Sequence, residues 1–154
     1  MSVIEEKLSQ LGIIIPTYNK PVANYVSVQR TGRLLYLSGN GPVVEGKVIF
    51  KGKIGKELTV EDGYEASRIT AINLISTLKN YLGDLDRIEQ IISIHGFVAS
   101  DEEFFDQPSV INGASDLIVK VFGEAGKHTR SAIGTNVLPF NTPVEIEMIV
   151  QIKE

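Results

Sequence analysis

The last apolar segment of the chain, residues 144–152, places the strongest constraint on the fold. Apolar residues alternate along it, at Val144, Ile146, Met148, Val150 and Ile152. A period of two is typical of a β-strand that turns one face toward a core. The opposite face begins with two glutamates and becomes apolar at Ile149. We therefore expect a sheet with one face in the core and the other covered in part by a second subunit.

Two long segments have helical periodicity and the residues that begin and end helices. Thr59 is a favourable N-cap for the first segment, and Gly83 supplies its stop. Pro108 suits the first turn of the second segment, and Gly123 ends it. Apolar residues recur through both segments at the spacing of one helix face. The two helices are predicted to cover one face of the sheet.

The remaining segments complete a mixed α+β pattern. A short helix follows Ser2, and Thr31-Gly32 marks a hairpin turn. Strands are predicted over 25–29, 34–38, part of 43–58, 88–98, 130–137 and 144–152. The length of 154 residues suits one domain, so we assign residues 1–154 to a single domain in which 1–20 form an N-terminal helical extension.

Composition excludes several classes of protein. The net charge of −4 makes nucleic acid an improbable partner, because nonspecific binding relies on basic surfaces. The chain has no cysteine, which excludes disulfides and thiolate chemistry. Its first residues lack the basic and apolar regions of a signal peptide, and no apolar run approaches the roughly 18 residues of a membrane span. We expect a cytoplasmic protein that does not enter a membrane.

Charged residues inside apolar strands are the main functional clue, since charge there costs free energy unless it is paired or meets a ligand. Arg130 begins one such strand, and a guanidinium can hold a carboxylate by two hydrogen bonds. Alternatively, it forms a structural salt bridge with Glu145 or Glu147. Those two glutamates share a strand face, so one could be an acid/base group of raised pKa. Alternatively, both are solvated residues of an edge strand.

Other motifs are weaker. The two histidines, His95 and His128, lack metal-ligand spacing, and we predict neither a metal nor an organic cofactor. His95 is expected to be a hydrogen-bonded core or interface residue. A Ser-His-Asp set remains open, although no G-x-S-x-G elbow is present. The small-residue loop that includes Gly39 is either a plain turn or a place where backbone approaches a ligand.

The C-terminal segments resemble the signature of the YjgF/Rid family, which includes RidA-like imine/enamine deaminases and proteins called endoribonuclease L-PSP. The signature matches at Arg130-Ser131-Ala132, Leu138-Pro139 and Val144-Glu145-Ile146-Glu147. Earlier segments match in order and spacing, namely Tyr25-Val26, Ser38-Gly39-Asn40, 59–82, Phe97-Val98 with Asp101, and Val110-Ile111-Asn112. The resemblance runs from about Tyr25 to the C-terminus.

The resemblance implies a chorismate-mutase-like fold and a homotrimer with ligand clefts between subunits. It assigns the carboxylate-binding role to Arg130 and the water-positioning role to Glu145. Tyr25 and Asn112 would line the cleft, with backbone groups near Gly39. The implied reaction is hydrolysis of 2-imino or enamino acids to 2-oxo acids and ammonia, without a cofactor. The small ligand would carry a carboxylate.

Some residues depart from the family pattern. Ala132 stands where RidA-like members often carry cysteine, and His128-Thr129 stand where small residues or proline are usual. The departures leave the substrate open more than the fold. Three other functions also remain open: a non-catalytic carboxylate-binding trimer that acts as sensor or carrier, a ribonuclease, and a structural or chaperone-like trimer.

Overall fold

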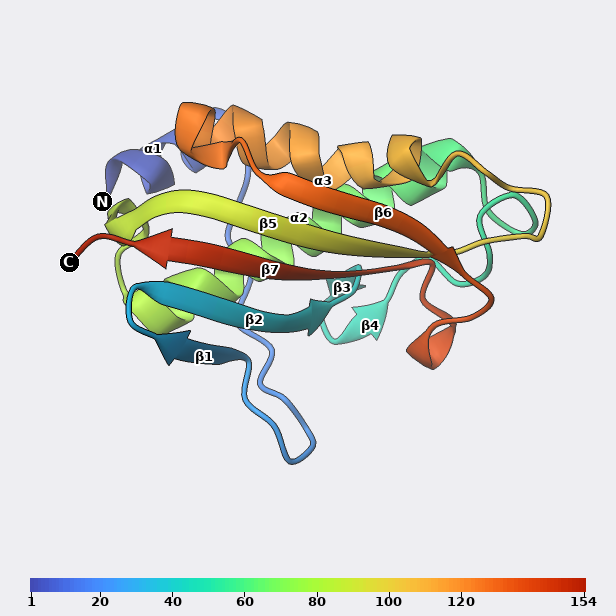
Figure 1. Cartoon of the computed structure of the whole chain (residues 1–154), viewed down its shortest axis with the longest axis horizontal. Coiled ribbons are helices and arrows are strands. Elements are labelled where there is room, and N and C mark those ends of the chain that lie inside the picture. The colour runs from blue at the N-terminus through green and yellow to red at the C-terminus, as the bar shows by residue number, and fades with distance from the viewer.

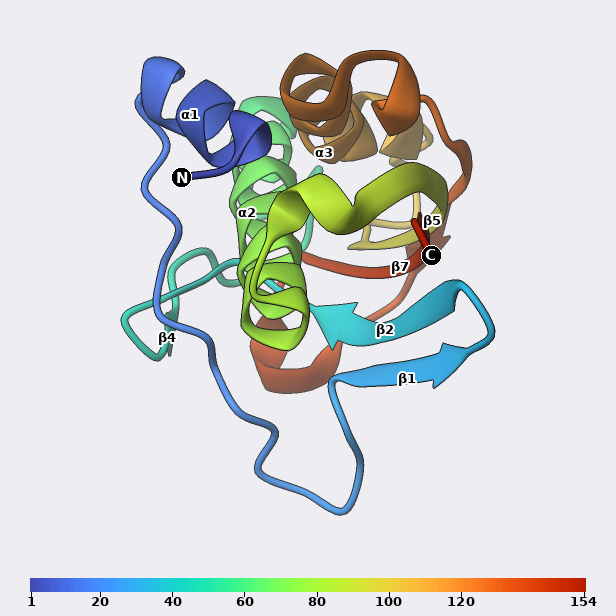
Figure 2. The ribbon, with the colours of Figure 1, turned by 90° about the vertical axis from the view of Figure 1, so that its left-hand side faces the viewer.

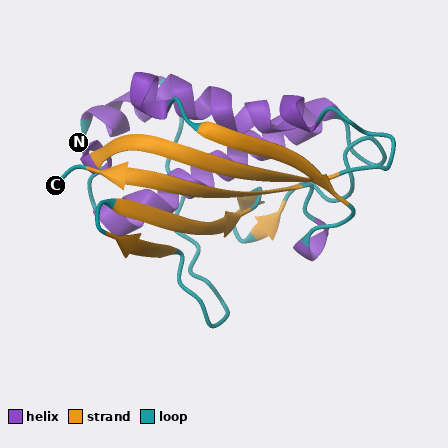
Figure 3. Ribbon diagram, in the orientation of Figure 1, coloured by secondary structure: helices purple, strands orange, loops and turns teal.

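The computed structural model describes all 154 residues and has a five-stranded sheet at its centre. In spatial order the strands are β1 (Val28–Thr31), β2 (Leu34–Asn40), β7 (Val144–Ile152), β5 (Ile88–Ala99) and β6 (Thr129–Thr135). A separate two-stranded hairpin is formed by β3 (Val43–Val44) and β4 (Lys47–Val48). Figure 3 distinguishes the large sheet from this small hairpin.

The large sheet is mixed, as the sequence predicts. β5 and β6 run parallel, whereas the pairs β1–β2, β2–β7 and β5–β7 are antiparallel. The parallel pair requires a crossover, which is supplied by the second long helix between β5 and β6. The α+β fold class is therefore confirmed.

Two long helices cover one face of the sheet (Figures 1 and 2). They are α2 (Val60–Leu82) and α3 (Gln107–Phe122). Thr59 and Asp62 form a reciprocal capping box at the start of α2, and Gly83 follows its end. Apolar residues of both helices join the buried face of β7 in one core cluster of 29 residues. None of the helices has the length and apolarity needed to cross a bilayer.

A short N-terminal helix, α1 (Val3–Gln10), packs at the end of the domain. The carboxylate of Asp86 accepts hydrogen bonds from the backbone N–H groups of Val3 and Ile4, at 2.8 and 3.0 Å. Leu8 is buried in the core. The chain then continues alongside α2, where the hydroxyl of Ser76 donates to the carbonyl of Pro16 at 2.8 Å (Figure 2).

The first strand differs from the prediction, because β1 begins at Val28 rather than at Tyr25. Tyr25 and Val26 have suitable side chains for a strand, but they are 56% and 58% exposed and lie outside the sheet. Before Val28, two bonds from Ser38 of β2 reach this segment: its N–H donates to the carbonyl of Ser27, and its hydroxyl donates to the carbonyl of Val26. Residues 19–27 are thereby free to form a loop that borders a pocket.

Candidate functional site

Arg130 lies on β6, at the edge of the sheet, and its side chain is directed toward α3. Nη1 donates to the hydroxyl of Ser115 at 3.1 Å, and Nη2 approaches the carbonyl oxygen of Pro108 at 3.5 Å. Ala132, two residues along the strand, packs against the core on the same side. The sequence places Arg130 and Ala132 on one face by alternation, and the structure identifies that face as the helix-covered one.

No carboxylate neutralises Arg130. The ion pairs of the structure involve other cations, and neither Glu145 nor Glu147 is bonded to this guanidinium. Within one chain, the alternative of a structural salt bridge from Arg130 to one of these glutamates is therefore wrong. β5 separates β6 from β7, and the glutamates project from the opposite face of the sheet. A half-buried guanidinium without a counter-charge is suited to an anionic ligand.

Further polar residues of α3 and of the loop before β6 surround Arg130. Asn112 lies one helical turn after Pro108 and one turn before Ser115, so it belongs to the α3 face along which the arginine extends. His128 contacts the same hydroxyl, with Nε2 2.9 Å from Ser115 Oγ. We call Arg130, Asn112, Ser115 and His128 the arginine cluster.

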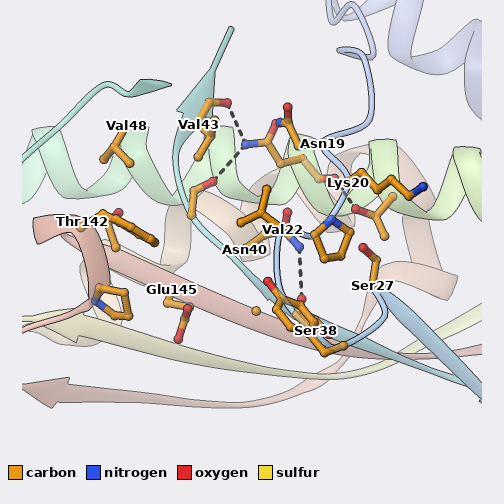
Figure 4. A pocket seen from close by; sticks show the side chains of 18 residues that line it. Asn19, Lys20, Val22, Ser27, Ser38, Asn40, Val43, Val48, Thr142 and Glu145 are labelled. Carbon is orange, nitrogen blue, oxygen red and sulfur yellow. Dashed lines mark hydrogen bonds between the residues drawn. The ribbon is translucent and has the colours of Figure 1, made fainter. Parts of the chain in front are cut away.

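Glu145 lies in a different place, on the border of a pocket of about 240 Å³. Figure 4 shows Glu145 beside the strands and Asn19 and Lys20 on the N-terminal loop across the pocket. Tyr25 and Gly39 also line it. A Cβ on Gly39 would come 2.9 Å from Cδ of Glu145, so the glycine makes room for this carboxyl group. We call Glu145, Gly39 and Tyr25 the glutamate cluster.

The two glutamates of β7 have different surroundings. Burial raises the pKa of Glu145 above its ordinary value of 4.5, and the nearby charge of Glu147 raises it further. No hydrogen-bond donor or cation is bonded to the Glu145 side chain. Glu147 instead contacts His95, with its Oε1 2.8 Å from Nδ1 of the imidazole. Two carboxyl groups in unlike environments can have unlike roles, and Glu145 has the properties of an acid/base group.

Two of these contacts have no signal in the amino-acid sequence. Ser115 and His128 are 13 positions apart, on a helix and a loop, and no motif connects them. His95 is predicted to be hydrogen-bonded, but its side chain is 45% exposed, so it is not a core residue. Its partner Glu147 is its register neighbour across β5 and β7, which only the strand pairing reveals. The chain has no group of three or more His, Cys, Asp or Glu side chains placed to hold a metal ion.

The predicted site residues thus fall into two separate groups within one chain. Tyr25, Gly39 and Glu145 share the pocket, whereas Arg130 and Asn112 lie at the other edge of the sheet and do not line it. One copy of the chain does not present Arg130 and Glu145 to the same small ligand. Both groups, however, lie at the surface, where they are accessible to another copy.

Comparisons with known proteins agree with the fold. Residues 5–152 match the family described as "YjgF/chorismate_mutase-like, putative endoribonuclease". Protein TCP17 of Trypanosoma cruzi is 39% identical over 150 residues, which are 97% of this chain and 94% of that protein. The crystal structure of Atu1372 from Agrobacterium tumefaciens is 44% identical, with a TM-score of 0.92 over 98% of this chain and 93% of that one. A structure from Shewanella oneidensis that carries the same endoribonuclease description is 32% identical, with a TM-score of 0.94 over 97% and 99% of the two chains.

Proposed function

Because this chain belongs to the YjgF/chorismate mutase-like family, we propose that it hydrolyses 2-imino acids and their enamine tautomers to 2-oxo acids and ammonia. The observation that carries this proposal is Arg130, a half-buried guanidinium with no counter-charge from its own chain. An anionic ligand supplies that charge, and a planar carboxylate matches the two-pronged donor geometry of the guanidinium.

The proposed site is assembled from two copies of the chain. The uncovered sheet face supports association, because it carries apolar side chains such as Tyr36 and Ile133, which are 46% and 50% exposed. In a homotrimer with sites between subunits, the arginine cluster of one copy meets the glutamate cluster of its neighbour. This arrangement explains why a single chain separates Arg130 from Glu145.

Catalysis in such a site requires positioning rather than a strong electrophile. Arg130 binds the carboxylate and thereby fixes the adjacent C2 carbon of the iminium group against a bound water, which lowers the entropic barrier to attack. Asn112 and Tyr25 hydrogen-bond the substrate or the water. Backbone groups near Gly39 complete the lining on the side of Glu145.

Glu145 is proposed to move the protons. The ionised carboxylate takes a proton from water as the water oxygen bonds to C2, which gives a tetrahedral carbinolamine. The same proton is then delivered to the amino group, and the C2–N bond breaks as the C2 hydroxyl returns its proton to Glu145. The released ammonia takes up that proton. The products are a 2-oxo acid and ammonium. A pKa raised by burial makes the Glu145 carboxylate a stronger base, which suits a group that must both accept and return a proton.

A competition assay tests the proposal. An amino-acid oxidase generates the imine in the presence of semicarbazide, and faster hydrolysis lowers the yield of semicarbazone. Wild type should suppress the signal and Arg130→Ala should not, while Arg30→Ala, which removes an exposed arginine from β1, should behave as wild type. Loss of melting temperature in parallel with activity would instead assign Arg130 a structural role. Failure of wild type on imines from several amino acids would reject the deaminase.

The alternatives give different results. A carrier or sensor would bind carboxylates equally well after Glu145→Gln, and it would have no turnover to lose. The enzyme variant should keep that affinity, but its kcat should fall by a factor on the order of 10²–10⁴, which is the usual contribution of a general base. A ribonuclease should cleave RNA in highly purified form and lose activity steeply with added salt.

A further inference from the structure

We propose that Ser115 and His128 are positioning residues that hold the guanidinium of Arg130 in the orientation that binds a carboxylate. This role rests on the proposed function, but it concerns ligand binding and can be measured without turnover. It is carried by a continuous chain of three hydrogen bonds that begins at the backbone of residue 126 and ends at the arginine.

The donor and acceptor roles in this chain follow from its two ends. Nδ1 of His128 lies 2.6 Å from the carbonyl oxygen of Gly126, which only accepts, so Nδ1 carries the proton. In the neutral ring Nε2 is then an acceptor, and the hydroxyl of Ser115 donates to it over 2.9 Å. At the other end the guanidinium only donates, so Ser115 Oγ accepts from Nη1 of Arg130 over 3.1 Å.

The consequence is that Ser115 cannot turn its hydrogen toward the guanidinium. His128 occupies that hydrogen, and the oxygen lone pairs of Ser115 are directed to Arg130. One N–H of Nη1 is thereby fixed, and Nη2 faces Pro108. The Nε hydrogen and the second hydrogens of Nη1 and Nη2 have no acceptor within the chain and remain for the ligand. An arginine side chain that is ordered before binding loses less conformational entropy when it binds.

His128, which departs from the usual family pattern, acquires a reason in this arrangement. His128 stands where small residues or proline are usual, and its imidazole reaches across to α3 from the loop that enters β6. Because Ser115 and His128 come from separate elements, their contact fixes the spacing between α3 and the start of β6. That spacing in turn sets where the arginine side chain can lie.

A hydroxyl that donates to an imidazole also resembles the nucleophile and base of a serine hydrolase. Two features favour positioning. The Oγ lone pairs, which would attack a substrate, already accept from a cation. Ser115 also lies within α3, whose backbone N–H groups are used in helical hydrogen bonds and cannot form an oxyanion hole.

The test measures binding of 2-oxobutanoate, a carboxylate that is not an imine, by calorimetry. Wild type should bind and Arg130→Ala should not. Ser115→Ala and His128→Ala should each weaken binding about three- to tenfold, the cost of ordering one long side chain. KM for the imine should rise by a similar factor with little change in kcat. Ser115→Thr, which keeps the hydroxyl, should recover affinity. Ser9→Ala, at an exposed position of α1, should match wild type in both affinity and melting temperature.

Several outcomes would overturn the proposal. Unchanged affinity in both Ser115→Ala and His128→Ala would overturn the positioning role and leave the role of Arg130 intact. Failure of wild type to bind 2-oxobutanoate would also overturn the proposal. Covalent labelling of Ser115 by a sulfonyl fluoride would replace positioning with a nucleophilic role. Normal binding with no imine hydrolysis, by contrast, would reject the deaminase and keep the positioning role.

Discussion

Arg130 and Glu145 project from opposite faces of the same sheet, with β5 between their strands. The arginine donates to Ser115 of α3 on the helix-covered side, whereas the glutamate projects between the buried neighbours Val144 and Ile146 toward the uncovered side. No rotamer change brings both groups to one small molecule. A reaction that uses both must therefore take them from two different chains.

Subunit complementation follows from this geometry. Arg130→Ala and Glu145→Gln should each be inactive, but unfolding and refolding them together should restore activity. In a symmetric assembly with random mixing, about a quarter of the sites would receive a native residue from each neighbour. Imine hydrolysis by the mixture is the measurement, and each variant refolded alone is the control. If the mixture is no more active than either variant alone, then either both residues act in a site within one chain or they do not share a site.

The pH dependence of hydrolysis should respond to Glu147. The base must be ionised, and the charge of Glu147 is the second cause, after burial, of the raised pKa of Glu145. Glu147→Gln should therefore lower that pKa, so that the acid limb of the kcat/KM profile moves to lower pH. The decrease in the Glu145 pKa should be smaller than its total elevation above the ordinary value, because the burial of Glu145 is unchanged in this variant. An acid limb that stays in place would show that another group limits the rate.

Glu145 should also reduce stability at neutral pH. Its folded pKa lies above the ordinary value of 4.5, so folding favours the protonated form. This favourable contribution is present below the unfolded pKa and is lost as pH rises through the folded pKa. Glu145→Gln should accordingly melt above wild type at about pH 8, and the difference should close in acid. Glu6→Gln, on exposed α1, should show no such trend. A gap that widens in acid would contradict the burial argument.

The turn before β7 contains a strained aromatic residue. Phe140 has φ 60° and ψ 19°, in the left-handed region, and its side chain is 83% exposed. Phe140→Gly removes that strain and loses little burial, so the free energy of unfolding should rise by about 0.5–1 kcal/mol. Urea denaturation measures it. Asn141→Gly, at the same φ of 60°, should gain less because asparagine tolerates this conformation. A loss of stability in Phe140→Gly would mean that the ring packs against something.

The sequence alone predicts those helices and strands whose local signals agree with their burial in the structure. α2 has a capping box, an apolar stripe and a terminal glycine, and β7 has strict alternation, so both were predicted within a residue of their observed ends. The strand predicted from Tyr25 begins too early because side-chain type favours a strand there, whereas the backbone pairing with β2 ends at Ser27.

The site was harder to predict because its contacts depend on register and on the facing of strands. Alternation places Arg130 with Ala132 and Glu145 with Glu147, but it does not say which face each pair occupies. The predicted salt-bridge alternative failed on that point. Ser115 with His128, and His95 with Glu147, are brought together only by the packing of α3 on β6 and by the pairing of β5 with β7.

The segment after the N-terminal helix has a further consequence for the pocket that contains Glu145. Residues 19–27 form one wall of that pocket. They lie between β1 on one side and, on the other, Pro16, whose carbonyl accepts from Ser76 of α2. The wall that carries Tyr25 is therefore attached to α2 as well as to the sheet. Proteolytic trimming within the first ten or so residues would leave this attachment in place, but it would remove the buried Leu8 from the core. Cleavage at this end would then lower the stability of the protein before it impaired substrate capture.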